Sequence, residues 1–219
     1  MINKLYSSII TFLMIFTFNI SAKADVSDRD LLAEAGDDWV QTNGNLAGHR
    51  YSTLGQINAN NASNLKVDWI YSTGGSTNAQ GPVIEHDNLL FFVQDNSIHA
   101  IHAGSGIRAW KYDYEMPEDF GGQFNPFFTG KHRGAAISGS NVYALTSDCA
   151  LIALNYQSGD EVFSHKIDRP YPRDFETTAD GNGYFCTSNP VAIPGGKIIV
   201  PMNATDTGGL QGYVHAHSA

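Results

Sequence analysis

The sequence predicts an all-β protein assembled from repeated units. Two segments, Ala100–Trp110 and Ala153–Phe163, share an Ala, a polar residue two positions later, a Gly four positions after that and a closing aromatic residue. A third copy begins at Ala216, so the copies start 53 and 63 residues apart. A period of this size is typical of a β-propeller or another repeat array. Because the chain stops inside the third copy, we expect it to be a fragment of a longer protein.

Short apolar runs separated by turn residues support the same fold class. Such runs predict strands, and they lie at residues 67–71, 89–94, 98–101, 141–146, 151–154, 197–202 and 211–216. Between them stand pairs that favour hairpin turns, such as Asp87-Asn88, Asp95-Asn96 and Gly195-Gly196. The sequence has no glycine-rich strand-to-helix transition that fits a Rossmann or phosphate-binding loop, and it has no long amphipathic helix. Both absences support the all-β interpretation.

Each repeat has an architectural logic. The closing aromatic residue, Trp110 or Phe163, is placed to pack between adjacent sheets, and Trp69 closes an earlier unit in the same way. The small Ala leaves room for the ring, and the Gly permits a turn with positive φ. We therefore expect Trp110 and Phe163 to be buried at equivalent places in successive sheets.

The first 24 residues predict a secretory signal peptide. Lys4 precedes an apolar run, and Ala22-Lys23-Ala24 matches the small-x-small cleavage pattern. We expect cleavage after Ala24, with an uncleaved N-terminal anchor as the alternative. Residues 25–219 then form one unit, the N-terminal part of the repeat array. It opens with one short helix at residues 28–35, capped by Ser27 or Asp28 and ended by Gly36.

Charge and cysteine content limit the classes of partner. The formal net charge is −9 and no Lys/Arg cluster occurs, which argues against a nucleic-acid partner. The acidity either helps docking to a basic partner such as a cytochrome or, as is more common, reflects an ordinary solvated surface. Cys149 and Cys186 either form a disulfide or remain buried thiols in adjacent strands, and the sequence leaves both open. Two longer excursions, residues 117–133 and 168–189, are of the length that often carries function.

A family resemblance rests on the opening block together with the repeats. The block consists of Asp38-Trp39, Arg50-Tyr51-Ser52, Gln56-Ile57-Asn58, Asn64 to Val67, Trp69 and Ser72-Thr73-Gly74. With the repeats, it resembles the start of the quinoprotein alcohol dehydrogenases. The repeats are similar to the tryptophan-docking motif of that family, with His102 and Asn155 in place of its Asp and Phe163 in place of its second Trp.

The resemblance implies an incomplete propeller of a kind that has eight blades in full-length members. It also implies a periplasmic enzyme that oxidises an alcohol with pyrroloquinoline quinone and a metal ion, usually calcium, and passes electrons to cytochrome c or another acceptor. In that chemistry the metal polarises the quinone C5 carbonyl, which receives the substrate hydride, while a carboxylate removes the hydroxyl proton. We expect that base to lie beyond Ala219, and neither substrate nor metal can be chosen from the sequence.

The resemblance assigns site residues unevenly. Arg133 of the Arg133-Gly134 pair matches the arginine that contacts the quinone. Phe127 and Phe128 stand where the family has a vicinal cysteine pair, and their rings are expected to cover one face of the quinone. Thr187 matches a cofactor-binding threonine. Asp206 is the nearest candidate for the metal-binding glutamate, one position out of register. The family's early glutamate falls at Ala79 and is missing.

Each assignment has a structural alternative. Arg133 can instead pair with Glu118 or Asp119, and Phe127 and Phe128 can anchor a loop in the core. Thr187 and Asp206 are also ordinary turn residues. A further pair, His215 and His217, shares one face of a predicted strand, but two histidines without a third ligand are a weak metal signal.

Two functions are therefore carried forward. The first is the dehydrogenase, for which Arg133, Thr187 and Asp206 should converge on the propeller axis. The second is a non-catalytic propeller of the same repeat type that acts as a protein-interaction scaffold. The missing cysteine pair and glutamate favour the scaffold, whereas the opening block and the Arg-Gly pair favour the enzyme.

Overall fold

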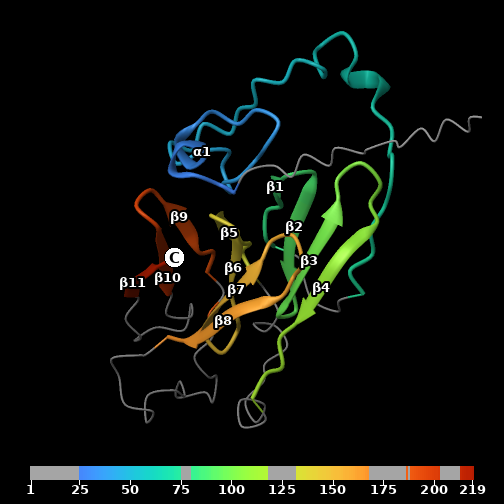
Figure 1. The fold of residues 1–219 in the computed structure, drawn as a ribbon. Helices are drawn as coiled ribbons and strands as arrows, with labels where there is room; N and C mark the ends of the chain where they lie inside the picture. Colours follow the sequence, from blue (N-terminus) through green and yellow to red (C-terminus); the bar gives the residue numbers. More distant parts are fainter. Residues whose placement is uncertain (1–24, 75–79, 118–131, 168–185, 187, 203–212) are drawn as a thin grey trace, which may run out of the picture.

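The computed structural model describes residues 25–74, 80–117, 132–167, 186, 188–202 and 213–219. The described residues form three antiparallel sheets that follow one another across the molecule (Figure 1). The first holds β1 (Ile84–His86), β2 (Leu89–Gln94), β3 (Ser97–His102) and β4 (Arg108–Asp113). The second holds β5 (Ala136–Ser138), β6 (Asn141–Leu145), β7 (Ala150–Asn155) and β8 (Glu161–Lys166). The third holds β9 (Val191–Ile193), β10 (Lys197–Met202) and β11 (Tyr213–Ser218). The all-β prediction is confirmed.

Sequential hairpins give each sheet its strand order. Strands pair with their neighbours in the chain, in the orders β1-β2-β3-β4, β5-β6-β7-β8 and β11-β10-β9. Two of the first sheet's turns have the same chemistry, because Asp87-Asn88 and Asp95-Asn96 all have positive φ, between 52° and 60°. Positive φ at both central residues is the requirement of a type I′ turn, which matches the twist of antiparallel strands.

The two complete repeats are equivalent in register. Ala100 of β3 lies opposite Trp110 of β4, and Ala153 of β7 lies opposite Phe163 of β8. A register shift follows directly after each Ala. Both aromatic side chains are half-buried and pack against the core, so the predicted equivalence is confirmed, although neither ring is fully buried.

A tryptophan from one unit packs on a glycine of the next. The indole Nε1–H of Trp69 donates to the carbonyl of Ala103 (2.9 Å), and that of Trp110 donates to the carbonyl of Tyr156 (3.0 Å). A Cβ at Gly106 would lie 2.5 Å from the Trp69 ring, and a Cβ at Gly159 would lie 2.6 Å from the Trp110 ring. Only a residue without a side chain allows these rings to approach so closely.

This contact gives a prediction for Gly159→Ala. Alanine there would be strained, because φ is +78°, and would also collide with the indole ring of Trp110. Gly139→Ala is the matched control, since Gly139 has φ of +58° and nothing within 4 Å of its ideal Cβ. We expect the control to cost about 1 kcal/mol of unfolding free energy, and Gly159→Ala to cost about 2 kcal/mol more. Equal losses in denaturant titrations would show that Trp110 does not depend on this glycine.

The prediction of a strand at residues 67–71 is wrong. The segment has no ladder partner among the described residues, and Val67 and Ile70 are 77% and 86% exposed. Its alternating apolar pattern is that of a strand, and Trp69 takes the place that Trp110 takes at the next unit. A strand is defined by its partner, however, and the pattern alone does not supply one.

The N-terminal helix is shorter than expected. Helix α1 covers Asp28–Leu32, and Ser27 caps it in a reciprocal capping box with Asp30. The expected end at residues 35–36 is wrong, because Ala33 already has extended backbone (ψ 156°). None of the helices in the described ranges has both the length and the apolar character needed to cross a bilayer.

The segment around α1 connects all three sheets. Val26 forms a backbone bridge with Gly139, and Trp39 forms another with Glu85. The side-chain amide of Gln41 donates to the carbonyl of Ala192 (3.0 Å). One continuous stretch of chain therefore contacts β1, the turn between β5 and β6, and β9, and so links the three sheets.

Aromatic packing fills the interface between the first two sheets. Phe91 and Tyr156 are almost completely buried, and their rings meet edge to face with centroids 6.4 Å apart. Trp110 lies 6.0 Å from Phe91, and His86 lies 5.1 Å from Tyr156. Full burial of each large apolar ring contributes about 2–3 kcal/mol, so these rings stabilise the packing of the first sheet on the second.

Candidate functional site

Four of the five residues assigned from the sequence lie outside the described part of the chain. Phe127, Phe128, Thr187 and Asp206 lie outside the described residues, as do Glu118 and Asp119, the alternative partners of Arg133. Arg133 itself is described. Its side chain is exposed, and it takes part in no ion pair within the described part of the chain. The predicted convergence of Arg133, Thr187 and Asp206 therefore stays a prediction.

Arg133 lies in one of three short stretches that each lead into the first strand of a sheet. These lead segments are residues 80–83, 132–135 and 188–190, before β1, β5 and β9. They are in close contact at Gly134, where an added Cβ would lie 3.0 Å from Pro82 and 3.2 Å from Oδ1 of Asn189. The three first strands therefore start from one common point, and Arg133 stands next to it.

Glycines make this approach possible. A Cβ at Gly81 would lie 2.8 Å from the backbone nitrogen of Gly134 and 3.2 Å from the carbonyl carbon of Arg133. Gly134 itself has φ of +120°, a conformation that residues with a side chain rarely adopt. The Arg133-Gly134 backbone is thus held between two other lead segments, which fixes the direction in which the arginine leaves the chain.

The Asn189 side chain has one free acceptor at the same place. Its amide nitrogen donates to Oγ1 of Thr42 (2.6 Å), whereas its buried Oδ1 has no hydrogen-bond partner among the described residues. A buried acceptor without a donor is costly unless a further group satisfies it. The convergence point therefore offers an exposed cation and an unsatisfied amide oxygen within a tightly packed backbone.

His132 is a buried residue of the site for which sequence reasoning gave no role. It is 2% exposed, and its Nε2 accepts a hydrogen bond from the backbone N–H of Asn96 (3.0 Å). Burial lowers the pKa of His132 to about 4, against smaller opposing effects of the Leu145 carbonyl and the Asp95 carboxylate. The ring is therefore neutral near pH 7, and its Nδ1 carries the proton. Its position directly before Arg133 was the one available signal.

The neutral His132 predicts an acid-sensitive stability. The imidazole of His132 has a pKa of about 6.5 in the unfolded chain and about 4 in the folded protein. Between these values the unfolded state binds more protons than the folded state, so acidification favours unfolding. We expect the free energy of unfolding to fall by about 3 kcal/mol between pH 7 and pH 4. The His132→Gln variant retains an acceptor but does not titrate. Denaturant titrations at both pH values should show a smaller loss in this variant, and an equal loss would contradict the prediction.

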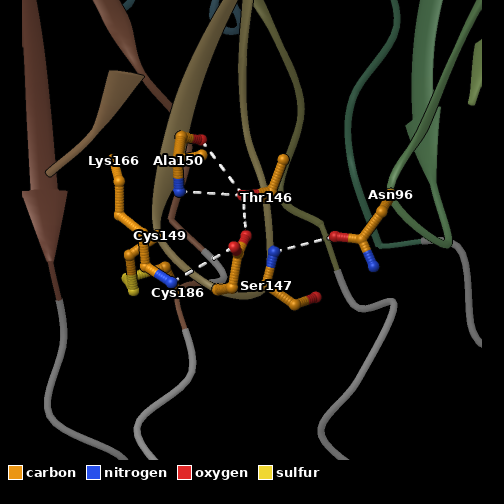
Figure 2. The surroundings of a disulfide bond; sticks show 8 residues. Asn96, Thr146, Ser147, Cys149, Ala150, Lys166 and Cys186 are labelled. Atoms are coloured by element: carbon orange, nitrogen blue, oxygen red, sulfur yellow. Dashed lines mark hydrogen bonds and ion pairs between the residues drawn. A yellow bond between two sulfur atoms is a disulfide. The ribbon is translucent and has the colours of Figure 1, made fainter. Parts of the chain in front are cut away.

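A disulfide links the turn between β6 and β7 to the chain just before β9 (Figure 2). Cys149 and Cys186 are bonded, with Cα atoms 5.0 Å apart and a sequence separation of 37. Cys149 lies in the turn between β6 and β7, and Cys186 directly precedes Thr187 in the sequence. The backbone N–H of Cys186 also donates to the carbonyl of Ser147 (3.0 Å). The disulfide thus resolves the alternative that the sequence left open. It joins a residue two positions before the third lead segment to the turn between β6 and β7.

The same turn contains a fully buried carboxylate. Asp148 is 0% exposed and accepts hydrogen bonds from the hydroxyls of Thr146 and Tyr114, the latter at 3.1 Å. Lys166 approaches it at 3.5 Å. Burial and the nearby Asp148 charge raise the pKa of Tyr114 to about 12, so Tyr114 remains a donor across the physiological range. The protein itself supplies the partners of this carboxylate, which therefore stabilises the turn between β6 and β7.

His215 and His217 do have a third histidine nearby. Their rings stack with centroids 6.2 Å apart on β11, and His165 of β8 lies 5.9 Å from His217. Partial burial lowers the pKa of His217, with smaller effects from the two neighbouring imidazoles. No group of three or more potential ligands in the described ranges is arranged to hold a metal ion. The three imidazole rings pack against one another between β8 and β11.

Comparisons with known proteins agree with the resemblance. Residues 39–219 match the family described as PQQ glucose/ethanol/alcohol dehydrogenase, β-propeller domain. The quinoprotein alcohol dehydrogenase PedH of Pseudomonas putida is 29% identical over 204 residues, which cover 90% of this chain and 31% of that protein. The 1-butanol dehydrogenase (quinone) of Thauera butanivorans is 32% identical over 178 residues, which cover 78% of this chain and 26% of that protein.

A solved structure shares the same arrangement of strands. The quinohemoprotein alcohol dehydrogenase of Comamonas testosteroni superposes with a TM-score of 0.69 at 26% identity, over 87% of this chain and 27% of that chain. The protein described here thus spans between a quarter and a third of the length of these relatives. Because the family match extends over most of the sequence, the chain belongs to the PQQ-dependent glucose, ethanol and alcohol dehydrogenases and matches their β-propeller domain.

Proposed function

We propose that this chain is part of an exported quinoprotein dehydrogenase that oxidises an alcohol with pyrroloquinoline quinone. The observation that carries the proposal is the position of Arg133. Its exposed side chain extends from the point where the backbones of the three lead segments are in close contact. Within this family such a place suits a cofactor, because one cation and a few polar groups in packed surroundings can orient a planar ligand. The quinone, when bound, would accept the hydride from the alcohol carbon.

The residues present fit an anionic quinone. The Arg133 guanidinium is planar, permanently charged and exposed, which suits bidentate contact with a carboxylate. The Oδ1 of Asn189 has no hydrogen-bond partner among the described residues and lies 3.2 Å from the ideal Cβ position of Gly134, so it would pair with a donor group of the ligand and not with its carboxylates. We propose in addition that Thr187 donates to the quinone and that the Phe127 and Phe128 rings cover one of its faces.

A metal ion, with calcium as the first choice, is the second part of the proposal. Asp206 would contribute a carboxylate oxygen, the ligand type that calcium prefers. The ion would supply Lewis-acid polarisation at the bound quinone. Removal of metal with a chelator should abolish alcohol oxidation, and added calcium should restore it.

The repeats support the architectural part of the proposal. We propose that the contacts of Trp69 with Gly106 and of Trp110 with Gly159 are tryptophan-docking motifs, each joining neighbouring blades of a propeller that has eight in the complete protein. We also propose that residues 1–24 are a signal peptide cleaved after Ala24 and that the mature protein works in the periplasm. Cytochrome c or another acceptor would receive the electrons.

Reconstitution of the full-length protein tests this function. The protein purified without cofactor should reduce an artificial dye in the presence of a primary alcohol only after pyrroloquinoline quinone and calcium are added. Omission of the quinone, the metal or the alcohol should each remove the signal. A full-length protein that binds no quinone under these conditions would contradict the proposal and favour the scaffold alternative.

A further inference from the structure

A chain of contacts connects the neighbour of Arg133 to the neighbour of Thr187. The backbone N–H of Asn96 donates to Nε2 of His132 (3.0 Å), and the backbone N–H of Ser147 donates to Oδ1 of Asn96 (2.7 Å). The carbonyl of Ser147 in turn accepts from the N–H of Cys186. Every member lies at most 7% exposed, so water does not compete for these bonds.

Asn96 is the centre of this chain of contacts. It stands in the type I′ turn between β2 and β3, and its φ is +60°. Its backbone N–H donates to His132 of the second lead segment. Its side-chain oxygen accepts from Ser147 in the turn of the second sheet (Figure 2). Its carbonyl accepts from the N–H of Tyr114 (3.1 Å). One residue therefore fixes three segments that come from two sheets.

We propose that Asn96 is a positioning residue for the quinone site. This proposal rests on the function proposed above for Arg133. Asn96 sets the place of the His132 ring, and His132 is covalently joined to Arg133. The Asn96 side chain sets the same segment relative to the disulfide-bonded turn that holds Cys186. Asn96 does not itself touch the cofactor in this account, since it acts through the backbone that presents Arg133.

The chain offers a matched control for a test. Asn88 has the same φ of +60°, follows an aspartate in the same type of turn and is exposed. Asn→Gly keeps the positive-φ backbone at either position and removes only the side chain. A difference between Asn96→Gly and Asn88→Gly therefore reports the Oδ1 contact to Ser147 and not the turn.

The experiment is a titration of the full-length, cofactor-free protein with pyrroloquinoline quinone. We expect Asn96→Gly to weaken binding by about threefold to thirtyfold, a range typical of residues that act through others, and Asn88→Gly to leave it unchanged. In an Arg133→Ala background the further effect of Asn96→Gly should shrink, because the residue it positions is gone. Unchanged affinity in Asn96→Gly, or the same loss in both backgrounds, would overturn the proposal.

The outcomes separate this proposal from the proposed function. If Arg133→Ala weakens binding and Asn96→Gly does not, only the positioning role fails. If Arg133→Ala binds as the wild type does, the function proposed for Arg133 fails first. Should Asn96→Gly not fold, His132→Leu and His132→Gln replace it. Gln keeps an acceptor for the Asn96 N–H and should keep quinone affinity, whereas Leu should lose it, and equal affinities would overturn the proposal.

Discussion

Gly81→Ala is expected to destabilise the protein by about 3 kcal/mol and to weaken quinone binding with it. The new Cβ would lie 2.8 Å from the nitrogen of Gly134, closer than real Cβ atoms come, and 3.0 Å from its Cα. The obstacle is backbone and cannot rotate away, so the cost belongs at the upper end of the range for overpacked sites. Denaturant titration measures the first effect, and titration of the full-length protein with the quinone measures the second.

Gly104→Ala is the control for this substitution. Its ideal Cβ has no neighbour within 4 Å, and Gly104 is not among the glycines with positive φ. We expect the control to change the free energy of unfolding by less than about 0.5 kcal/mol. If Gly81→Ala behaves like the control, the lead segments do not pack tightly against one another, and their packing does not fix the direction of Arg133.

Removal of the disulfide should have an effect of similar size. For the 37-residue separation between Cys149 and Cys186, the chain-entropy relation gives about 4 kcal/mol of stabilisation. The double variant with both cysteines changed to serine should unfold at correspondingly lower denaturant concentration. A reducing agent should shift the wild-type transition and leave that of the variant in place. A wild-type protein insensitive to reduction would argue that the bond does not form.

The repeat pattern predicted the fold class, but it did not predict every strand. The inner strands of the sheets, such as β2 and β10, are apolar runs and were predicted almost to the residue. The outer strands β4 and β8 mix charged and aromatic residues, because their outward positions are exposed, and they carry no apolar run to recognise. The first strands β1, β5 and β9 span three residues each, too few for periodicity to be seen.

Arg133 could be proposed from the sequence because an Arg-Gly pair at one place in a family is a local signal. The surroundings of Arg133 could not, since they depend on contacts between distant residues. Asn96 and His132 are 36 residues apart, and Asn96 and Ser147 are 51 residues apart. In the sequence Asn96 is only a turn residue of the same kind as Asn88, and its role appears only when the sheets are assembled.

The cysteine pair shows the same limit. Sequence alone allowed a disulfide or two buried thiols, since bridging depends on a Cα separation that no spacing rule provides. The sheet arrangement brings the two Cα atoms to 5.0 Å and decides the question. The sequence thus identified the two cysteines as candidates, and tertiary packing determined that they are joined.

Quinone affinity of the Arg133→Ala variant tests the central claim most directly. In the full-length protein, loss of charge-assisted hydrogen bonds of about 1.5–3 kcal/mol each should weaken pyrroloquinoline quinone binding by about tenfold or more. Arg108→Ala is the control, because Arg108 is an exposed arginine on β4 outside the lead segments. The account predicts a large loss for Arg133→Ala and wild-type affinity for Arg108→Ala. Wild-type affinity in both variants would contradict it.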